Sequence, residues 1–317
     1  MHRPTAVAAA VALLLSACTG ASDFEPSVQR PVASAPTSAS TTSSVATPTP
    51  EPLIELPRGG RRIFPAHRLV GFSGGRGESF GRLGVENLDE RAAEIEKLGR
   101  RYTKDGRTPL PIFELIAVVA HQSATDTGLY RTHEPSEVID AFLAAVRRHE
   151  GLLLLNIQPG RADFIDDVMA FEKWLLEPDV GLALDPEWAV DAGEVPGQVI
   201  GSTTGEELDS VAAYLSSLVR AHDLPEKVLV YHQFHTSTIV DEDKLRPHPG
   251  VVLVKSIDGV GVPAEKVATW ERLAQGLSPH VYTGFKLFFE EDTRRGSLMT
   301  PAEVLALRPQ PSYVLYE

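Results

Sequence analysis

Short apolar runs alternate with longer segments of helical periodicity from residue 68 to the end of the chain. Apolar runs of this length are typical of strands, whereas apolar residues at helical spacing indicate amphipathic helices. Regular alternation of the two predicts a parallel sheet. The predicted strands are residues 68–72, 111–120, 152–157, 181–188, 227–232, 251–255, 280–287 and 312–316; the predicted helices are 88–103, 135–149, 162–176, 205–222, 263–275, a weak one at 241–246 and one that opens at Thr300.

Eight such strands predict a single (β/α)8 TIM barrel over residues 61–317, which is close to the usual length of that fold. A doubly wound open sheet is the alternative. Such a sheet usually carries a phosphate-binding G-x-G-x-x-G turn after its first strand. Residues 73–77 are rich in glycine but lack that spacing, so the pattern favours the barrel.

The fourth predicted strand ends in two acids and an aromatic residue, Asp185, Glu187 and Trp188. Alternation of side chains puts Leu182 on the face toward the helices and Ala183 on the interior face, together with both acids. Two acids two residues apart on a strand lie roughly 6–7 Å apart. Barrel enzymes carry their active sites at the C-terminal ends of the strands, so we expect a site here. A charged strand-to-helix loop is the alternative.

Polar residues also lie at or near the ends of other predicted strands. They are Glu114 on the second strand, Asn156 on the third with Gln158 and Arg161 after it, His232 on the fifth with Gln233 after it, Asp258 after the sixth and Lys286 on the seventh. Asn156 and Gln158 share a face and are suited to bind sugar hydroxyls. Arg161 precedes a predicted helix, where its charge opposes the helix dipole and indicates an anionic partner.

Glu114 lies within an apolar strand, where a carboxylate is costly unless it is paired. Arg161, Lys255 and Lys286 are candidate partners. A structural ion pair inside the barrel explains Glu114 as well as a catalytic role does, so both interpretations stay open.

This set of acids, amides and aromatic residues favours glycoside hydrolysis, in which one carboxylic acid protonates the leaving oxygen and a second carboxylate supports the reacting carbon or activates water. We expect Glu187 as the general acid, Asp185 as the second carboxylate and Glu114 in reserve. The expected substrate-binding residues are Asn156, Gln158, Arg161, Trp188, His232, Gln233, Asp258 and Lys286. The sequence holds no nucleophile elbow, P-loop or spaced metal-ligand motif, and we expect no cofactor and no metal.

The N-terminus has the pattern of an export signal, with an apolar segment at residues 6–17 that is too short to span a bilayer. Leu15-Ser16-Ala17-Cys18 resembles a bacterial lipobox. The resemblance implies a signal peptide at residues 1–17 and a mature protein that begins with lipid-modified, palmitate-bearing Cys18. Cys18 is the chain's only cysteine, so no disulfide is possible within it.

Residues 18–60 are predicted to form a disordered tether, because residues 26–50 are rich in Ser, Thr and Pro and contain no aromatic residue. The expected location is outside the cytoplasm, anchored to the cell membrane through the lipid alone. Apolar residues make up 43% of the chain and charged residues 23%, as in soluble globular proteins. A net charge of −13 argues against a nucleic-acid partner.

Asp185-Pro186-Glu187 resembles the end of the DxxDxDxE motif that chitinase-like glycosidases carry on their fourth strand. The resemblance implies that Glu187 is the general acid and that Asp185 orients a substrate acetamido group. Val180 and Ala183 stand where the motif has its earlier acids, which puts substrate-assisted chemistry in doubt.

Most of the domain also resembles uncharacterised exported lipoproteins of high-GC Gram-positive bacteria, which carry a TIM-barrel domain. The matching segments are Gly81-Arg82-Leu83-Gly84, residues 158–161, residues 184–188 and residues 232–234. The favoured hypothesis is a lipid-anchored hydrolase of an envelope or extracellular glycan. The alternatives are a barrel that binds cell-wall glycan without cleaving it, and a metal-dependent phosphodiesterase barrel that uses Glu114, Asp185, Glu187 and His232.

Overall fold

A computed structural model describes residues 53–77, 80–84 and 87–317. The predicted signal peptide, the lipidation site at Cys18 and the tether up to residue 52 lie outside these residues and stay predictions. In the part of the chain that is described, no helix is both long and apolar enough for a membrane crossing.

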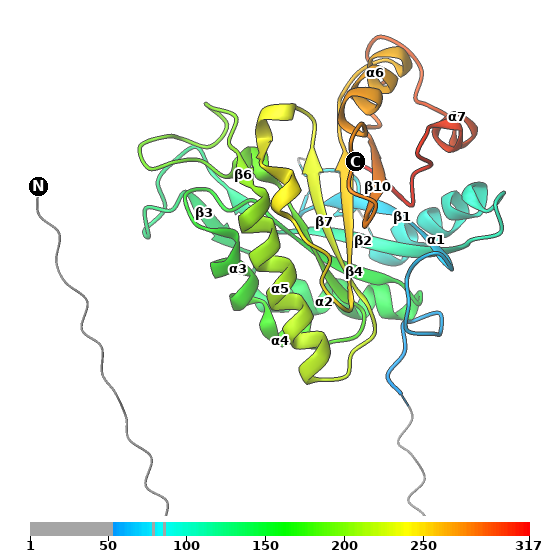
Figure 1. Cartoon of the computed structure of the whole chain (residues 1–317), viewed down its shortest axis with the longest axis horizontal. Coiled ribbons are helices and arrows are strands. Elements are labelled where there is room, and N and C mark those ends of the chain that lie inside the picture. The colour runs from blue at the N-terminus through cyan, green and yellow to red at the C-terminus, as the bar shows by residue number, and fades with distance from the viewer. Residues whose placement is uncertain (1–52, 78–79, 85–86) are drawn as a thin grey trace, which may run out of the picture. The chain divides into compact units, whose positions relative to one another are not determined.

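Eight parallel strands of the described residues form a closed barrel (Figure 1). The strand order is β1-β11-β10-β9-β7-β5-β4-β2, and β1 also pairs with β2, which closes the sheet and excludes the open alternative. The bounds are β1 His67–Gly74, β2 Thr108–Ala120, β4 Leu152–Ile157, β5 Val180–Leu184, β7 Lys227–Gln233, β9 Val251–Ile257, β10 Val281–Leu287 and β11 Tyr313–Tyr316. The prediction of a parallel α/β barrel is confirmed.

Three short strands lie outside the barrel. The strand β3 (Arg131–His133) pairs antiparallel with the end of β2. The strands β6 (Thr203–Thr204) and β8 (Ile239–Val240) form a small parallel sheet of their own.

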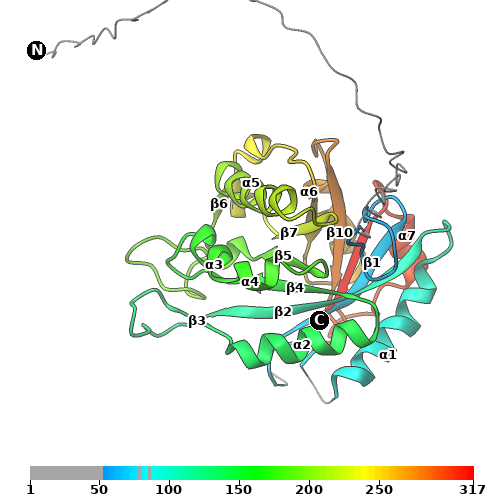
Figure 2. The ribbon, with the colours of Figure 1, turned by 90° about the horizontal axis from the view of Figure 1, so that it is seen from below.

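Helices lie on the outer side of the strands (Figure 2). Their bounds are α1 Leu88–Gly99, α2 Ser136–Arg148, α3 Phe164–Ala170, α4 Glu172–Leu175, α5 Gly205–Ala221, α6 Pro263–Leu273 and α7 Pro301–Ala306, with 3-10 turns at η1 Arg100–Tyr102, η2 Pro186–Trp188, η3 Thr236–Thr238 and η4 Glu242–Lys244. Three of these helices, α1, α5 and α7, begin with a side-chain N-cap. Asn87 accepts from Asp89 N, Thr204 from Glu207 N, and Thr300 from Glu303 N.

Three predicted elements differ from the structure, and one of them, the weak helix expected at 241–246, is only the 3-10 turn η4. The single helix expected at 162–176 is two helices, because Phe171 leaves the helical region (φ −94°, ψ 6°) and packs its ring against His133 and Trp174. The strand expected at 181–188 ends at Leu184, and residues 186–188 form the 3-10 turn η2.

Side-chain alternation divides the apolar residues into two clusters. Leu182 and Leu229 pack in the outer cluster between strands and helices. Ala183 and Val230 pack in the inner cluster, which fills the barrel. The predicted facing of β5 is therefore confirmed.

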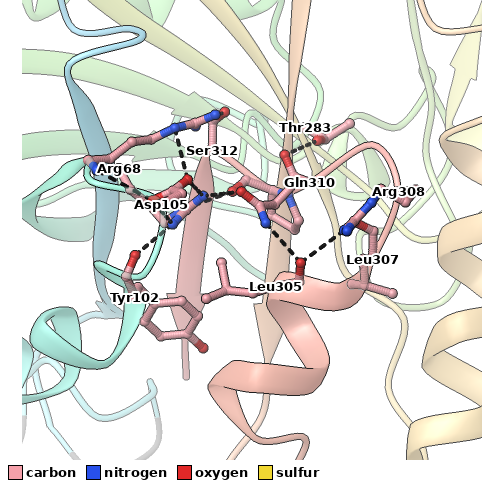
Figure 3. Close-up of polar contacts among 11 residues, drawn as sticks. Arg68, Tyr102, Asp105, Thr283, Leu305, Leu307, Arg308, Gln310 and Ser312 are labelled. Atoms are coloured by element: carbon pink, nitrogen blue, oxygen red, sulfur yellow. Dashed lines mark hydrogen bonds and ion pairs between the residues drawn. The ribbon is translucent and has the colours of Figure 1, made fainter.

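The guanidinium of Arg68, near the N-terminal end of β1, is fully buried on the outer side of the strand, among turns at that end of the barrel (Figure 3). It donates to the carbonyls of Tyr102 (2.6 Å) and Pro311 (3.0 Å), to Oδ2 of Asp105 (2.7 Å) and to Oε1 of Gln310 (2.7 Å). The buried charge of Arg68 therefore serves stability, since catalysis in barrel enzymes takes place at the opposite, C-terminal end.

The folded domain begins earlier than the predicted boundary at residue 61. Leu56 is buried in the inner cluster, and Arg58 donates to the carbonyl of Pro109 and pairs with Glu96. Leu56 and Arg58, within the segment predicted as tether, therefore contact the barrel, whereas Leu53 and Ile54 are exposed.

Candidate functional site

A cavity of about 580 Å³, called the large cavity below, opens at the C-terminal ends of the strands. Each barrel strand or the residues directly after it contribute to its wall. The lining residues are Ser73, Ile116, Gln158, Asp185, Glu187, Trp188, Phe234, Asp258, Gly259, Val260, Thr269, Lys286, Phe288 and Glu317. Its size is within the usual range of small-molecule sites.

Asp185 is the first residue after β5 and is held by two amides. Nδ2 of Asn156 donates to its Oδ1 (3.1 Å), and Nε2 of Gln158 donates to its Oδ2 (3.3 Å). Gln158 is fixed in turn, because its Oε1 accepts from the backbone N–H of Ala120 (3.1 Å). Burial raises the pKa of Asp185, while the nearby charges of His232 and Lys286 oppose that rise.

Glu187 lies on η2 rather than on a strand, yet its side chain reaches the same cavity. Its Oε2 is buried with no hydrogen-bond partner among the described residues. Burial, and then the neighbouring carboxylates of Asp185 and Asp258, raise the pKa of Glu187 to about 8. Glu187 is therefore a protonated, unpaired carboxylic acid at neutral pH.

A buried ionic network lies beneath the large cavity and has His232 at its centre. Nδ1 of His232 lies 2.6 Å from Asp258, and Nε2 lies 3.1 Å from Glu114 and 3.9 Å from Asp185. The contact with Glu114 is an ion pair and not an aligned hydrogen bond. Burial disfavours the imidazolium and would lower the pKa of His232. The negative charges of Asp258 and Glu114 have the larger combined effect, so the pKa is raised well above its ordinary value.

Glu114 is fully buried and ionised within this network. It accepts hydrogen bonds from Ser73 (3.3 Å), from Asn156 (3.2 Å) and from the hydroxyl of Tyr313. Burial alone would raise the pKa of Glu114, but His232 and then Lys286 and Tyr313 lower it to about 2.

Lys286 brings a second positive charge to the cavity wall. Its Nζ lies 2.7 Å from Glu317 and 4.0 Å from Asp258. Burial is again outweighed by these carboxylates, so the pKa of Lys286 is raised well above its ordinary value. The site thus contains fixed carboxylates, two buried cations and one protonated acid.

The expected site residues divide into three groups. Glu187, Asp185, Gln158, Trp188, Asp258 and Lys286 line the large cavity. Asn156, His232 and Glu114 lie beneath it in the polar network. Arg161 and Gln233 lie elsewhere.

Two of the expected substrate-binding residues, Arg161 and Gln233, are not among those that line the large cavity. Arg161 donates to the carbonyl of Glu194 (2.7 Å) and stacks over the ring of Tyr130, so its charge contacts neighbouring loops. Gln233 follows His232 on β7, and alternation turns its side chain toward the outer layer, where Leu229 and Tyr231 also point.

The expected partners of Glu114 also need correction, because Arg161 is remote and Lys255 pairs with Glu242 at 2.8 Å on the outer face of the sheet. Lys286 acts on Glu114 only through space. The main partner is His232. Its pairing favours the structural interpretation of Glu114 over a catalytic one.

Sequence reasoning missed Tyr313, Ser256 and Glu317. Ser256 donates to Asp258 (2.7 Å), and Glu317 holds Lys286. On the last strand, Tyr313 faces the interior, whereas the ring of Tyr316 packs in the outer cluster. Consistent use of alternation from Leu315 would have identified Tyr313.

Among the described residues, no group of three or more His, Cys, Asp or Glu side chains has the arrangement of a metal site. Both ring nitrogens of His232 face carboxylates, and a metal ligand would need one of them unprotonated. The residues expected for a phosphodiesterase centre do not fit that role in this arrangement.

No protein-family model matches the chain, and no curated protein matches it either. Among solved structures, a GH18 chitinase from Pseudoalteromonas aurantia aligns with 65% of this chain and 85% of its own length, at a TM-score of 0.25 and 10% identity. A superposition this loose says nothing about chemistry. The resemblance to exported lipoproteins has no support from these comparisons and stays a prediction.

Proposed function

We propose that the protein is a glycoside hydrolase that cleaves an envelope or extracellular glycan. The observation that carries the proposal is that Glu187 and Asp185 line one cavity at the C-terminal end of the barrel. Glu187 is protonated there, and its Oε2 has no hydrogen-bond partner among the described residues. Glycoside hydrolysis needs two carboxyl groups of this kind, one that gives a proton and one that stays charged.

Glu187 supplies the proton. It protonates the glycosidic oxygen as the bond between that oxygen and the anomeric carbon breaks, and the leaving alcohol departs neutral. A pKa of about 8 suits this role, because the acid is protonated at neutral pH and still gives up its proton readily.

Asp185 faces the positive charge that develops at the anomeric carbon. Burial raises the pKa of Asp185, and the Asn156 amide and the imidazolium of His232 oppose that rise in favour of the ionised form. The carboxylate stabilises that carbon directly or takes a proton from the attacking water, which then completes hydrolysis to the free sugar.

Aromatic residues suit the cavity for carbohydrate. Trp188, Phe234 and Phe288 line it, and such rings stack on the apolar faces of sugars. Gln158 and Lys286 provide polar groups on the opposite sides of the site.

We place this activity at the cell envelope. The lipobox-like Leu15-Ser16-Ala17-Cys18 and the Ser/Thr/Pro-rich segment after it support lipid anchoring through Cys18. Metabolic labelling with an alkyne palmitate analogue tests this part: wild type should be labelled and Cys18→Ala should not. Labelling of both proteins would contradict the anchor at Cys18.

The activity is tested by release of reducing sugar from a panel of envelope and extracellular polysaccharides. We expect Glu187→Gln to lower kcat by about 10²–10⁴-fold, the usual worth of a general acid. Asp185→Asn should lower it at least as far. Glu206→Gln, an exposed residue of α5, is the matched control and should leave the rate unchanged.

Two outcomes would contradict the proposal. One is equal activity of wild type and Glu187→Gln. The other is retention of wild type on insoluble glycan with no product after long incubation, which would favour the non-catalytic binding barrel.

A further inference from the structure

A second, smaller hollow adjoins the large cavity. It has a volume of about 220 Å³ and shares Glu187, Trp188 and Phe234 with the large cavity. Its remaining wall is the loop segment Gly197, Gln198, Val199 and Ile200. This hollow, called the small cavity, is below the size range of sites for drug-sized ligands, so it suits a single ring.

The loop that forms the small cavity is tied to the backbone around Glu187. Gly201 N donates to the carbonyl of Glu187 (2.8 Å), and Ser202 N donates to the carbonyl of Ala189 (2.9 Å). Gly201 approaches so closely that a Cβ there would lie 2.1 Å from the carbonyl oxygen of Ala189. The position of the loop relative to Glu187 is therefore set by main-chain contacts.

The surface that this loop presents is apolar. Ile200 is 61% exposed and Val199 is 38% exposed. Single exposed aliphatic residues are common on soluble proteins and need no partner. Val199 and Ile200 line the same small cavity as Glu187, the proposed general acid, and this cavity adjoins the large cavity. A substrate that extends beyond the large cavity past Glu187 would therefore cover both side chains.

The two cavities differ in the carboxyl groups that line them. Asp185 lines the large cavity, whereas Glu187 lines both. The acid must contact the oxygen that bridges the two halves of the substrate, and the second carboxylate must face the ring whose anomeric carbon reacts. The large cavity therefore fits the glycosyl unit that is cleaved off, and the small cavity fits the leaving group.

We propose that the small cavity is the leaving-group subsite and that Val199 and Ile200 bind the apolar face of a sugar ring there. The inference rests on the proposed function. It makes the substrate an oligosaccharide or polysaccharide with a saccharide unit on each side of Glu187. A small polar leaving group would leave this subsite empty.

The test compares two substrates with the same glycosyl unit, namely an oligosaccharide from the polysaccharide that wild type cleaves and the glycosyl fluoride of the sugar released. Fluoride leaves as a small ion and contacts neither loop residue. We expect Ile200→Ser and Val199→Ser to lower kcat/KM on the oligosaccharide about tenfold, since each removes aliphatic surface that the ring would bury. On the fluoride both variants should equal wild type.

Met169→Ser is the matched control, because Met169 is 55% exposed on α3 and lies outside both cavities. It should change neither rate. An equal fall on both substrates, or no fall on either, would overturn the leaving-group subsite while leaving the hydrolase intact. If wild type cleaves no polysaccharide of the panel, the proposed function fails and the subsite fails with it.

Discussion

Nδ1 of His232 lies 2.6 Å from Oδ2 of Asp258, and both side chains are almost completely buried. The opposite ring nitrogen lies 3.1 Å from Glu114. His232 is therefore a cation held between carboxylates directly beneath the large cavity. Its charge balances Glu114 and favours the ionised form of Asp185. The buried network therefore influences the protonation states of the carboxyl groups in the cavity above it.

The first prediction concerns this cation. Because His232 lowers the pKa of both Asp185 and Glu187, His232→Gln should raise both values. Activity needs Asp185 ionised and Glu187 protonated, so both limbs of the pH profile of kcat/KM should move to higher pH. A lower rate with unmoved limbs would show that His232 has only a structural role.

The same change should destabilise the fold, because it leaves the carboxylate of Glu114 buried without its cation. The expected loss is about 3–5 kcal/mol, measured by chemical denaturation. His222→Gln is the control, since His222 is an exposed histidine directly after α5, and the stability of this variant should match wild type.

A second prediction follows from the pKa of Glu187, which is raised from 4.5 to about 8 in the folded state. Between these two values the folded state binds more protons than the unfolded state, so wild-type stability falls as pH rises through this window. Glu187→Gln escapes that loss. Its gain in Tm over wild type should grow with pH and level off above pH 8, reaching about 1 kcal/mol or more, or roughly 2–4 °C.

Thermal unfolding of wild type and Glu187→Gln over a pH series tests whether the difference in Tm grows as pH rises. A Tm difference that stays constant from acid to alkaline pH would contradict it. Glu206→Gln again provides the matched control, because Glu206 is exposed.

A third prediction concerns the buried ion pair of Lys266 and Asp292, 2.9 Å apart and each 1% exposed. Lys266 also donates to the carbonyl of Gly259, and Asp292 accepts from the backbone N–H groups of Gly261 and Phe288. The pair thus joins the loops after β9 and β10 that line the large cavity.

Lys266→Met should cost about 3–5 kcal/mol, because it leaves Asp292 buried and unpaired. It should also raise KM, since the cavity wall loses its anchor. The double variant Lys266→Met/Asp292→Asn should recover part of the stability. A single variant as stable as wild type in urea titration would contradict the assigned role.

A fourth prediction separates the two ends of the barrel. Arg68→Met removes the donor to the carbonyls of Tyr102 and Pro311 at the N-terminal end (Figure 3). Leaving buried carbonyls unpaired should lower stability by about 2–4 kcal/mol. At a temperature where the variant is folded, kcat/KM should equal wild type, because the site lies at the opposite end. A tenfold lower kcat/KM would show that the two ends are coupled.

The barrel itself was predictable, since strand and helix periodicity identified all eight barrel strands. Glu187 was placed on a strand wrongly, although Pro186 carried the signal. Proline cannot donate to a central ladder, so β5 could not continue through it. Gln233 was assigned to the mouth although it neighbours inward-facing His232, and adjacent strand residues point to opposite faces.

The partners inside the site were not predictable from one sequence. Glu114 pairs with His232, and Lys286 pairs with Glu317; each pair joins two different strands or strand ends. Strand periodicity gives the face of a residue but not its height relative to other strands, which is set by the register of the closed barrel. The choice of His232 over Lys255 as partner therefore needed the structure.

The central claim is that Glu187 is a protonated acid at neutral pH, and carbon-13 NMR of glutamate labelled at the side-chain carboxyl measures this most directly. We expect one carboxyl resonance that titrates near pH 8 and is missing from Glu187→Gln. A Glu187 resonance that titrates near 4.5, the ordinary value for glutamate, would contradict it.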